Sequence, residues 1–443
     1  MNSHALTTVR SPSEKDRGLT ELDAPLPVHE QTKGLSLEEE NHEDDRNELT
    51  ETAAAPPVEE SRPRCDEKTA SGSQEDFESK RKDEQKAQTQ SQHSSLLTEL
   101  YTVSWLVFFS FLGTLARLGV EAITLYPNTP FPSRVLWANL GGSFAMGFLV
   151  EDRKLFRDEW GSEKPSSTPD AHLKVKKTLP LYIGLSTGFC GCFTSFSSFM
   201  RDAFLALTNA LQAPSPTRPY HNDTNIPSRN GGFSFLALLA IVIIHPAVSL
   251  AALKVGAHFA LLIQPFTPSL PFRLFRRFVD PLAVLLAFGC WLGSIFLSIW
   301  PPGNDTLWRF RAVFPLVFAP LGCLLRFYAS KYLNARIPAF PLGTFACNIF
   351  GTAVLGMAWD LQHARGIGAG SGVTNACSVL QGVMEGFCGC LTTVSTWVLE
   401  LDGLRRRHAW IYGLTSVGVG LSFMVVIMGS MGWTVGFAGP GCG

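Results

Sequence analysis

The sequence predicts an all-α membrane protein in which two inverted four-helix repeats are joined by a single linker transmembrane helix and preceded by a disordered N-terminal tail. Three observations support this fold class. Residues 1–95 are polar and acidic, apolar segments recur from Trp105 onward, and the chain after residue 100 contains the same motifs twice in the same order. The whole-chain averages, 46% hydrophobic and 17% charged residues, resemble a soluble protein only because they mix these regions.

The tail differs sharply in charge from the rest of the chain. Residues 1–95 hold 12 Lys/Arg and 22 Asp/Glu, a net charge of −10, whereas the remainder holds 25 basic and 16 acidic residues, a net charge of +9. A segment so poor in apolar residues cannot bury enough surface to offset the entropy lost on ordering. We therefore predict a disordered cytoplasmic tail over residues 1–95.

Nine apolar segments have the length that a membrane-spanning helix needs. They cover residues 102–125, 134–151, 179–211, 233–263, 280–300, 310–333, 340–360, 376–402 and 409–436. The third and the eighth are too long and too rich in glycine for single straight helices, and each contains the string Gly-Phe-Cys-Gly-Cys, at 188–192 and 386–390. A helix break at membrane depth is tolerated only inside protein or beside a polar cavity. We expect both helices to break at this string and to mark a site.

The basic residues of the loops predict the orientation. With a cytoplasmic N-terminus, the inner loops 152–178, 264–279, 334–339 and 403–408 hold 14 Lys/Arg, and the outer loops 126–133, 212–232, 301–309 and 361–375 hold four. Such an excess is typical of the cytoplasmic side. Two glycosylation sequons, at Asn222 and Asn304, fall in outer loops. An odd number of spans then places the C-terminus outside the cell.

The internal repeat defines the domains. Leu112-Gly-Thr-Leu-Ala-Arg117 aligns with Leu321-Gly-Cys-Leu-Leu-Arg326, and Asn139 and Asn348 each follow 22 residues after these arginines. Each repeat has four spans, so the single helix at 280–300 makes the second repeat enter from the opposite face, as in many transport folds. We divide the chain into the tail 1–95, a first repeat 100–263, a linker 264–303 and an inverted second repeat 304–436.

Polar residues inside the spans are candidates for a site. Asn139 and Asn348 are either helix–helix contacts or amide donors that face a pore, and their matched positions favour the pore. Arg117 and Arg326 are either structural anchors to carbonyl groups or a charge that attracts an anion. After the first glycine string come Thr194, Ser195, Ser197 and Ser198, whose hydroxyls can replace part of an anion's hydration shell.

Aromatic and sulfur side chains complete the motif. Phe196 and Phe199 carry a positive ring edge that could meet an anion. The repeated Cys-x-Cys pairs at 190–192 and 388–390 are either packing residues or ligands of a soft metal, and packing is the commoner role. We find no catalytic triad, P-loop or dinucleotide fingerprint, so the sequence does not predict an enzyme.

These motifs resemble the fluoride channel/exporter family, called CrcB-type in bacteria and two-domain fluoride exporters in eukaryotes. The similarity covers roughly residues 100–436, and its most specific blocks are GFCGCFTSFSSF at 188–199 and GFCGCLTTVSTW at 386–397. In the bacterial family two small four-helix subunits associate antiparallel, and the eukaryotic form fuses them through one linker helix. The resemblance implies a passive fluoride-selective channel in the plasma membrane that protects the cell from fluoride.

The resemblance also implies roles for individual residues. It places Asn139 and Asn348 in the pore, Phe196 and Phe199 in contact with fluoride, and Thr344 in a vestibule where the first repeat has Val135. The implied polar track consists of Ser197, Ser198, Ser395 and Thr396. The backbone carbonyls implied to hold a structural Na⁺ belong to the break regions at Gly191, Thr194, Gly389 and Thr392. No organic cofactor is implied.

The chain departs from the family at Val394 and Trp397, where phenylalanines are expected. We therefore predict one competent and one degenerate pore, without a choice between them. Two alternatives stay open: a proton-coupled fluoride transporter, for which Glu121, Asp202, Glu385 and Glu400 are the acidic candidates, and a non-transporting membrane or metal-handling protein. Because both repeats lie in one chain, we expect a monomer, with fluoride and the lipid bilayer as partners and no nucleic acid.

Overall fold

The computed structural model describes residues 72–124, 126, 129–156, 176–211, 229–271, 274–300, 309–364 and 371–437. Side chains are described from residue 95 onward, except at residues 309 and 371–374. Residues 1–71, which hold most of the predicted tail, lie outside this description. Residues 80–443 group into one compact unit. Every regular element among the described residues is helical.

The first repeat starts with the longest helix. Helix α1 begins at Gly72, so it includes the last part of the segment that we assigned to the tail; this part is rich in Glu, Gln and Lys, which favour helix. The elements of this repeat are α1 (Gly72–Ile123), α2 (Val135–Glu151), α4 (Pro180–Ile183), η3 (Gly184–Cys190), α5 (Gly191–Phe193), α6 (Phe196–Leu207) and α7 (Gly231–Ile263).

The second repeat follows the linker and has the same order of elements. The linker comprises η4 (Phe275–Val279) and α9 (Asp280–Ile299). The repeat itself comprises η5 (Arg309–Val313), α11 (Phe314–Leu333), η6 (Asn334–Arg336), α12 (Leu342–His363), α13 (Ser371–Gln381), η7 (Gly382–Cys388), α14 (Gly389–Leu391), α15 (Ser395–Gly403) and α16 (Arg406–Thr434).

The helices match the nine predicted spans. Within the described ranges, seven helical stretches are long and apolar enough to cross a membrane, and the shorter apolar helix α2 is an eighth. The remaining predicted span, the third at 179–211, corresponds to the interrupted run from α4 to α6. The protein is therefore an all-helical, multi-pass membrane protein, and the predicted fold class is confirmed.

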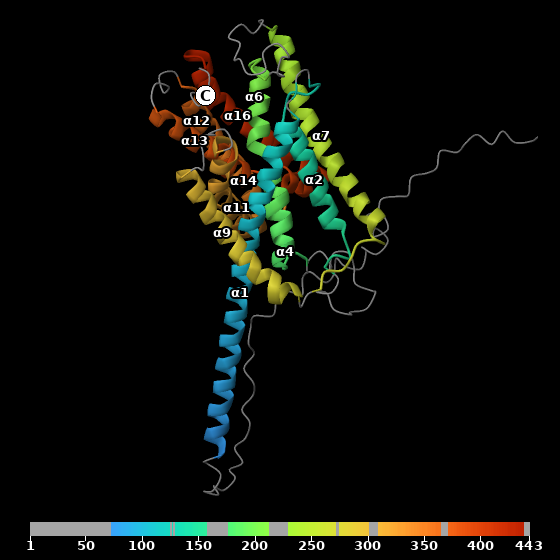
Figure 1. The fold of residues 1–443 in the computed structure, drawn as a ribbon. Coiled ribbons are helices and arrows are strands. Elements are labelled where there is room, and N and C mark those ends of the chain that lie inside the picture. Colours follow the sequence, from blue (N-terminus) through green and yellow to red (C-terminus); the bar gives the residue numbers. More distant parts are fainter. Residues whose placement is uncertain are drawn as a thin grey trace, which may run out of the picture. The chain divides into compact units, whose positions relative to one another are not determined.

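The half-helix that follows each break packs against helices of the other repeat as well as its own. Within each repeat, α2 packs along α7, and α12 packs along α16 (Figure 1). Helix α6 of the first repeat also packs against α12 and α16, and α15 of the second repeat packs against α2 and α7. The main core is therefore shared, and Phe196 and Met200 lie in one cluster with Trp397 and Met424.

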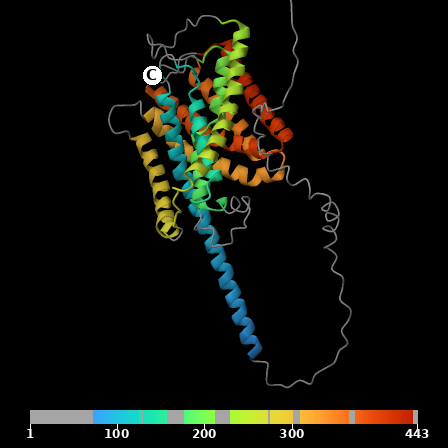
Figure 2. The ribbon, with the colours of Figure 1, turned by 90° about the vertical axis from the view of Figure 1, so that its right-hand side faces the viewer.

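The linker helix α9 lies at the edge of the bundle. It packs against α11, and its Ala287 shares a small buried cluster with Val107 and Phe111 of α1. Figure 2 shows this helix at the side of the bundle. Only 17% of its most apolar 18-residue stretch is buried inside the protein, the smallest share among the seven long helices. Its exposed leucine and phenylalanine side chains are those of a helix that faces lipid on most of its surface.

The position of the helix breaks differs from our prediction. The strings at 188–192 and 386–390 are helical, as parts of η3–α5 and η7–α14. The backbone becomes extended only afterwards, at Thr194 (ψ 151°) and Ser195 (φ −141°, ψ 118°) in the first repeat and at Thr392 (ψ 153°) in the second. The prediction that the glycine-rich string itself breaks the helix was wrong, because side chains from other helices redirect the amides that follow it.

Candidate functional site

The two helix breaks cross at the centre of the bundle and cap each other. Thr194 Oγ1 accepts hydrogen bonds from the backbone N–H groups of Val394 and Ser395, both at 3.1 Å. In the reciprocal contact, Thr392 Oγ1 accepts from the N–H of Ser197, at 3.1 Å. The first N–H groups of a helix lack partners within it. The threonine at each break therefore accepts hydrogen bonds from the first N–H groups of the half-helix in the other repeat.

The asparagines predicted for the pore hold the breaks open. Ser195 N–H donates to Asn139 Oδ1 at 2.9 Å, and Thr393 N–H donates to Asn348 Oδ1 at 2.9 Å. In a continuous α-helix these two amides would bond to the carbonyls four residues earlier, at Gly191 and Gly389. The asparagine side chains therefore interrupt both helices, and they release these two carbonyls from their usual helical partners.

The hydroxyls of the predicted polar track gather around this crossing. Ser395 Oγ donates to Cys190 O at 3.0 Å, and Ser197 Oγ lies 3.0 Å from Thr392 Oγ1. Ser198 and Thr396 instead lie in the first turns of α6 and α15. There the backbone N–H groups of these two residues donate to the capping hydroxyls of Ser195 (3.2 Å) and Thr393 (3.4 Å). Apart from Thr396, which is partly exposed, the crossing is thus a cluster of buried polar groups.

Arg117 and Arg326 are buried completely or nearly so, at 0% and 2% exposure, and each clamps both repeats. Arg117 Nε donates to Cys192 O in its own repeat, and Arg326 Nε donates to Cys390 O in its own. A Cβ on Gly389 would collide with Arg117, and one on Gly191 would collide with Arg326. This arrangement is the one expected of structural anchors.

The partners of the two arginines in the opposite repeat differ. Arg326 Nη2 donates to the carbonyl of Thr187 at 2.8 Å. At the equivalent position the second repeat has Glu385, whose carboxylate lies 2.6 Å from Arg117 Nη1 and 3.2 Å from Arg201 Nη1. Arg117 Nη2 also donates to the carbonyl of Glu385, as Arg326 does to that of Thr187. Both arginines are therefore held by carbonyl groups, and Arg117 has a buried ion pair in addition.

The aromatic residues of the motif form one cluster with a histidine. The Phe196 ring meets Phe199 edge-on at 5.7 Å and Trp397 edge-on at 5.4 Å. Phe199 stacks on His245 of α7, with ring centroids 4.5 Å apart and planes 15° apart. The phenylalanines of the first repeat thus contact both the tryptophan of the second repeat and a histidine that the sequence analysis did not select.

Thr344 belongs to a separate polar group in the second repeat. Its hydroxyl donates to Glu400 Oε1 at 2.6 Å, and Tyr412 donates to Glu400 Oε2 at 2.7 Å. Asn334 donates to the same carboxylate at 3.2 Å. Val135, at the matching position of the first repeat, is buried in the main core cluster.

The repeated cysteines pack with apolar residues. Cys192 and Cys390 share a small buried cluster with Leu106, Ala319 and Cys323. Cys190 and Cys388 belong to the main core. Among the described residues, no group of three or more His, Cys, Asp or Glu side chains is placed to hold a metal ion.

Four residues of these networks were missing from the sequence analysis: Arg201, His245, Asn334 and Tyr412. The signal that could have found Arg201 and His245 is their position inside apolar spans, since an ionisable residue at membrane depth is rarely there without a partner. Tyr412 carried no such signal, because a tyrosine in a membrane helix is unremarkable until its hydroxyl partner is known.

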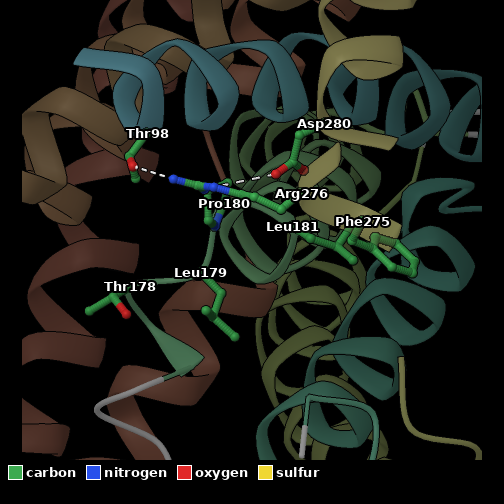
Figure 3. A pocket seen from close by; sticks show the side chains of 8 residues that line it. All are labelled: Thr98, Thr178, Leu179, Pro180, Leu181, Phe275, Arg276 and Asp280. Atoms are coloured by element: carbon green, nitrogen blue, oxygen red, sulfur yellow. Dashed lines mark hydrogen bonds and ion pairs between the residues drawn. The ribbon is translucent and has the colours of Figure 1, made fainter. Parts of the chain in front are cut away.

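A surface pocket of about 220 Å³ lies apart from these groups (Figure 3). Arg276 crosses it, donating to Thr98 Oγ1 at 3.0 Å and lying 3.9 Å from the carboxylate of Asp280. Leu179, Pro180 and Leu181 form another part of its wall. None of the residues proposed from the sequence lines this pocket.

Comparison with known proteins identifies the family. The model of the CrcB-like protein family, described as Camphor Resistance (CrcB), matches residues 104–218 and 313–430, one match in each repeat. Fluoride export protein 1 of Neurospora crassa is 54% identical over 380 residues, covering 79% of this chain and 70% of that protein. The Candida albicans protein of the same name is 33% identical, with 73% and 78% covered.

A bacterial relative matches a single repeat. The fluoride-specific ion channel FluC of Pseudomonas paraeruginosa is 33% identical over 122 residues, covering 27% of this chain and 91% of that protein. No solved structure matches the chain. Because the family model matches both repeats and two relatives are 54% and 33% identical over most of the chain, this chain belongs to the CrcB family.

Proposed function

We propose that this protein is a passive fluoride-selective channel that exports fluoride across the plasma membrane. The observation that carries the proposal is the pair of crossed helix breaks, each held open by a buried asparagine and flanked by hydroxyls and aromatic rings. The names of the relatives, fluoride export protein and fluoride-specific ion channel, support the same function.

The donors suit a small, strongly hydrated anion. Amide N–H and hydroxyl groups can replace lost water molecules, and the positive edges of phenylalanine rings add an attraction. We assign the residues of the two candidate pores to Asn139, Asn348, Phe196, Phe199, Ser197, Ser198, Ser395, Thr396 and Thr344, and we expect only one of the two pores to conduct. Selectivity over larger halides follows from the small bore that such closely packed donors leave.

The break region also fits the structural Na⁺ implied by the family resemblance. Gly191 and Gly389 have carbonyls whose usual helical partners, the amides of Ser195 and Thr393, bond to asparagines instead. Carbonyl oxygens are the ligands that a hard cation prefers. We propose that Gly191, Thr194, Gly389 and Thr392 hold the ion through their backbone carbonyls, where its charge would favour a nearby anion.

A sodium site is tested by stability rather than transport. We expect the midpoint of thermal unfolding in detergent to fall when Na⁺ is replaced by N-methyl-D-glucamine and to recover when Na⁺ returns. An unchanged midpoint in sodium-free buffer, with sodium shown to be absent from the protein by elemental analysis, would exclude the site.

The orientation follows from the loop charges. We propose a cytoplasmic N-terminus, an extracellular C-terminus and a functional monomer, since one chain contains both repeats. The inside-negative membrane potential then drives anions outward by about 2.3 kcal/mol per charge for each 100 mV. A channel therefore suffices for export, without an energy-coupling site.

The test is fluoride efflux from liposomes that contain the purified protein. We expect efflux that chloride does not replace, and a loss of at least tenfold in Phe196→Ile, which removes a ring edge from the crossing. Val394→Ile is the matched control at the equivalent position of the second repeat and should change efflux by less than twofold. Wild-type liposomes that release no more fluoride than empty ones would refute the proposed function.

Proton-coupled fluoride transport is the second candidate, and one observation favours it. Glu400 is partly buried and bonds to Thr344, Asn334 and Tyr412, and no Lys or Arg within the described residues forms an ion pair with it. Such a carboxyl could carry a proton. A fluoride reversal potential that stays constant when a pH gradient is imposed would exclude coupling.

A further inference from the structure

We propose that only the half-site around Asn348 offers a donor to fluoride, because His245 occupies the corresponding place at Asn139. The inference rests on the proposed function and adds to it which of the two pores conducts. It also assigns a role to His245, a residue outside the repeated motifs of the sequence. The two halves differ in how each asparagine uses the two N–H groups of its side chain.

The orientation of both asparagine side chains is determined by their neighbours. Asn139 Oδ1 accepts from Ser195 N–H and Asn348 Oδ1 accepts from Thr393 N–H, each at 2.9 Å. An amide nitrogen cannot accept a hydrogen bond, so the oxygen must face the backbone N–H in both cases. The Nδ2 groups consequently point their hydrogens elsewhere.

The two Nδ2 groups differ in what they meet. Asn139 Nδ2 lies 3.4 Å from Ser195 O and 3.5 Å from His245 Nδ1. Asn348 Nδ2 donates to Thr393 O at 3.2 Å, and its second hydrogen has no acceptor among the described residues. Both asparagines are fully buried. One half therefore has a buried donor without an acceptor, and the other has a ring nitrogen at that place.

The hydrogen-bond role of His245 Nε2 follows from its other neighbours. Asp202 is paired with Arg201 at 3.2 Å, and its carboxylate accepts from Ser133 Oγ at 2.6 Å. The Ser133 oxygen must then accept from His245 Nε2, which lies 2.9 Å away. In the neutral ring the proton sits on Nε2, so Nδ1 presents a lone pair to Asn139.

This lone pair excludes an anion from Asn139. Two nitrogens 3.5 Å apart leave no space for an ion between them, and a lone pair repels negative charge. The ring is also locked in place, because it is completely buried and stacks on Phe199. His245 therefore acts as a built-in plug of the first half-site.

The second repeat has a serine where the first has this histidine. Helices α12 and α16 are in contact where Gly356 faces Met424, since a Cβ on Gly356 would lie 3.5 Å from the Met424 sulfur. Asn348 lies eight residues before Gly356, and Ser416 lies eight residues before Met424. Ser416 is thus at the level of Asn348. Its hydroxyl donates to its own helix, at Tyr412 O (2.7 Å), and leaves the asparagine donor without a competitor.

Other groups beside Asn348 complete a path for an anion. Thr352, one turn further along α12, is fully buried, and its hydroxyl has no hydrogen-bond partner among the described residues. Phe196 enters from the other repeat: a Cβ on Gly420 of α16 would lie 3.1 Å from its ring. The conducting half-site thus combines an amide, a hydroxyl and an aromatic edge.

The half-site around Asn139 also has polar groups one helical turn beyond His245. Ser143 and Ser249 lie one turn beyond Asn139 and His245 on α2 and α7, and both hydroxyls are buried without a partner in the described part of the chain. Removing the imidazole is therefore expected to open a path that already has donors rather than to leave an apolar void.

Fluoride efflux from liposomes tests the assignment with matched variants. We expect Asn348→Asp, which keeps the oxygen acceptor and loses the donor, to lower efflux at least tenfold, and Asn139→Asp to lower it at most threefold. His245→Ser, which places the residue type of the second repeat in the first, should raise efflux of the Asn348→Asp variant at least fivefold. Wild-type efflux measured in parallel shows whether the proposed function itself holds.

Equal losses in the two aspartate variants would overturn the assignment of the pore, and failure of His245→Ser to restore efflux would overturn the role of the histidine. A measurement on the wild type avoids misfolded variants. With ¹⁵N-labelled asparagine, we expect added fluoride to shift the side-chain amide signal of Asn348 and to leave that of Asn139 in place. A larger shift at Asn139 would refute the inference.

Discussion

The two repeats share one architecture but differ in the charge of their centres. In the first, Asn139 is followed by a connected series of polar side chains, His245, Ser133 and Asp202, that ends on Arg201. In the second, Asn348 has only its backbone partner, and the nearby carboxyl of Glu400 bonds to neutral groups. Two repeats can therefore preserve the same helix break while the side chains beside it differ.

The arginine clamps provide the strongest test of this difference. Arg117→Ala leaves Glu385 buried with Arg201 as its remaining partner, so we expect a loss of about 3 kcal/mol in unfolding free energy. Arg326→Ala removes hydrogen bonds to carbonyls and should cost less, about 1–2 kcal/mol. Chemical unfolding in detergent, followed by tryptophan fluorescence, measures both.

Glu385→Gln supplies the control for the clamp. Added to Arg117→Ala, it removes the buried charge and should recover part of the loss. A double variant as unstable as Arg117→Ala alone would show that the arginine acts through packing rather than through the ion pair.

Substitution of the glycines that contact the two arginines should have the next largest effect on stability. Gly191→Ala and Gly389→Ala would place a Cβ against Arg326 and Arg117, and we expect each to cost about 1–3 kcal/mol. Gly389→Ala should cost more, because the ion pair with Glu385 restrains Arg117. Gly119→Ala, where a Cβ meets nothing within 4 Å, is the control and should be neutral or slightly stabilising in the same unfolding assay.

The helix caps at the breaks should have smaller effects. Ser195→Ala removes the acceptor for Ser198 N–H (3.2 Å), and Thr393→Ala removes the one for Thr396 N–H (3.4 Å). We expect about 1 kcal/mol for each, measured by thermal unfolding. Ser422→Ala, at an exposed hydroxyl that bonds within its own helix, is the control. Equal stability of all three variants would contradict the capping role.

The smallest expected effect lies at the surface between the repeats. Lys254 of α7 and Asp402 of α15 approach to 2.7 Å, with side-chain exposures of 58% and 35%. Solvent screens such a pair, so Lys254→Ala should lower stability by less than about 1 kcal/mol, and the difference should disappear at high salt. A larger loss that persists in high salt would indicate a role beyond the ion pair.

Much of this fold could be predicted because its signals are local in the sequence. Apolar length marks the spans, and the repeated motifs around Arg117 and Arg326 and around Asn139 and Asn348 mark two copies of one unit. The exact break could not be predicted in this way. It depends on Asn139 and Asn348, which lie dozens of residues from the amides that they accept.

The membrane class, the inverted repeat and the residues that carry the family resemblance can be read from the amino-acid order alone, since they depend on composition and spacing along the chain. The mutual capping of the breaks, the contact of Arg117 with Glu385 and that of His245 with Asn139 emerge only in the folded structure. These contacts join helices far apart in the chain. Hydrogen bonds depend on distance and direction in space, and the order of residues specifies neither until the helices have packed.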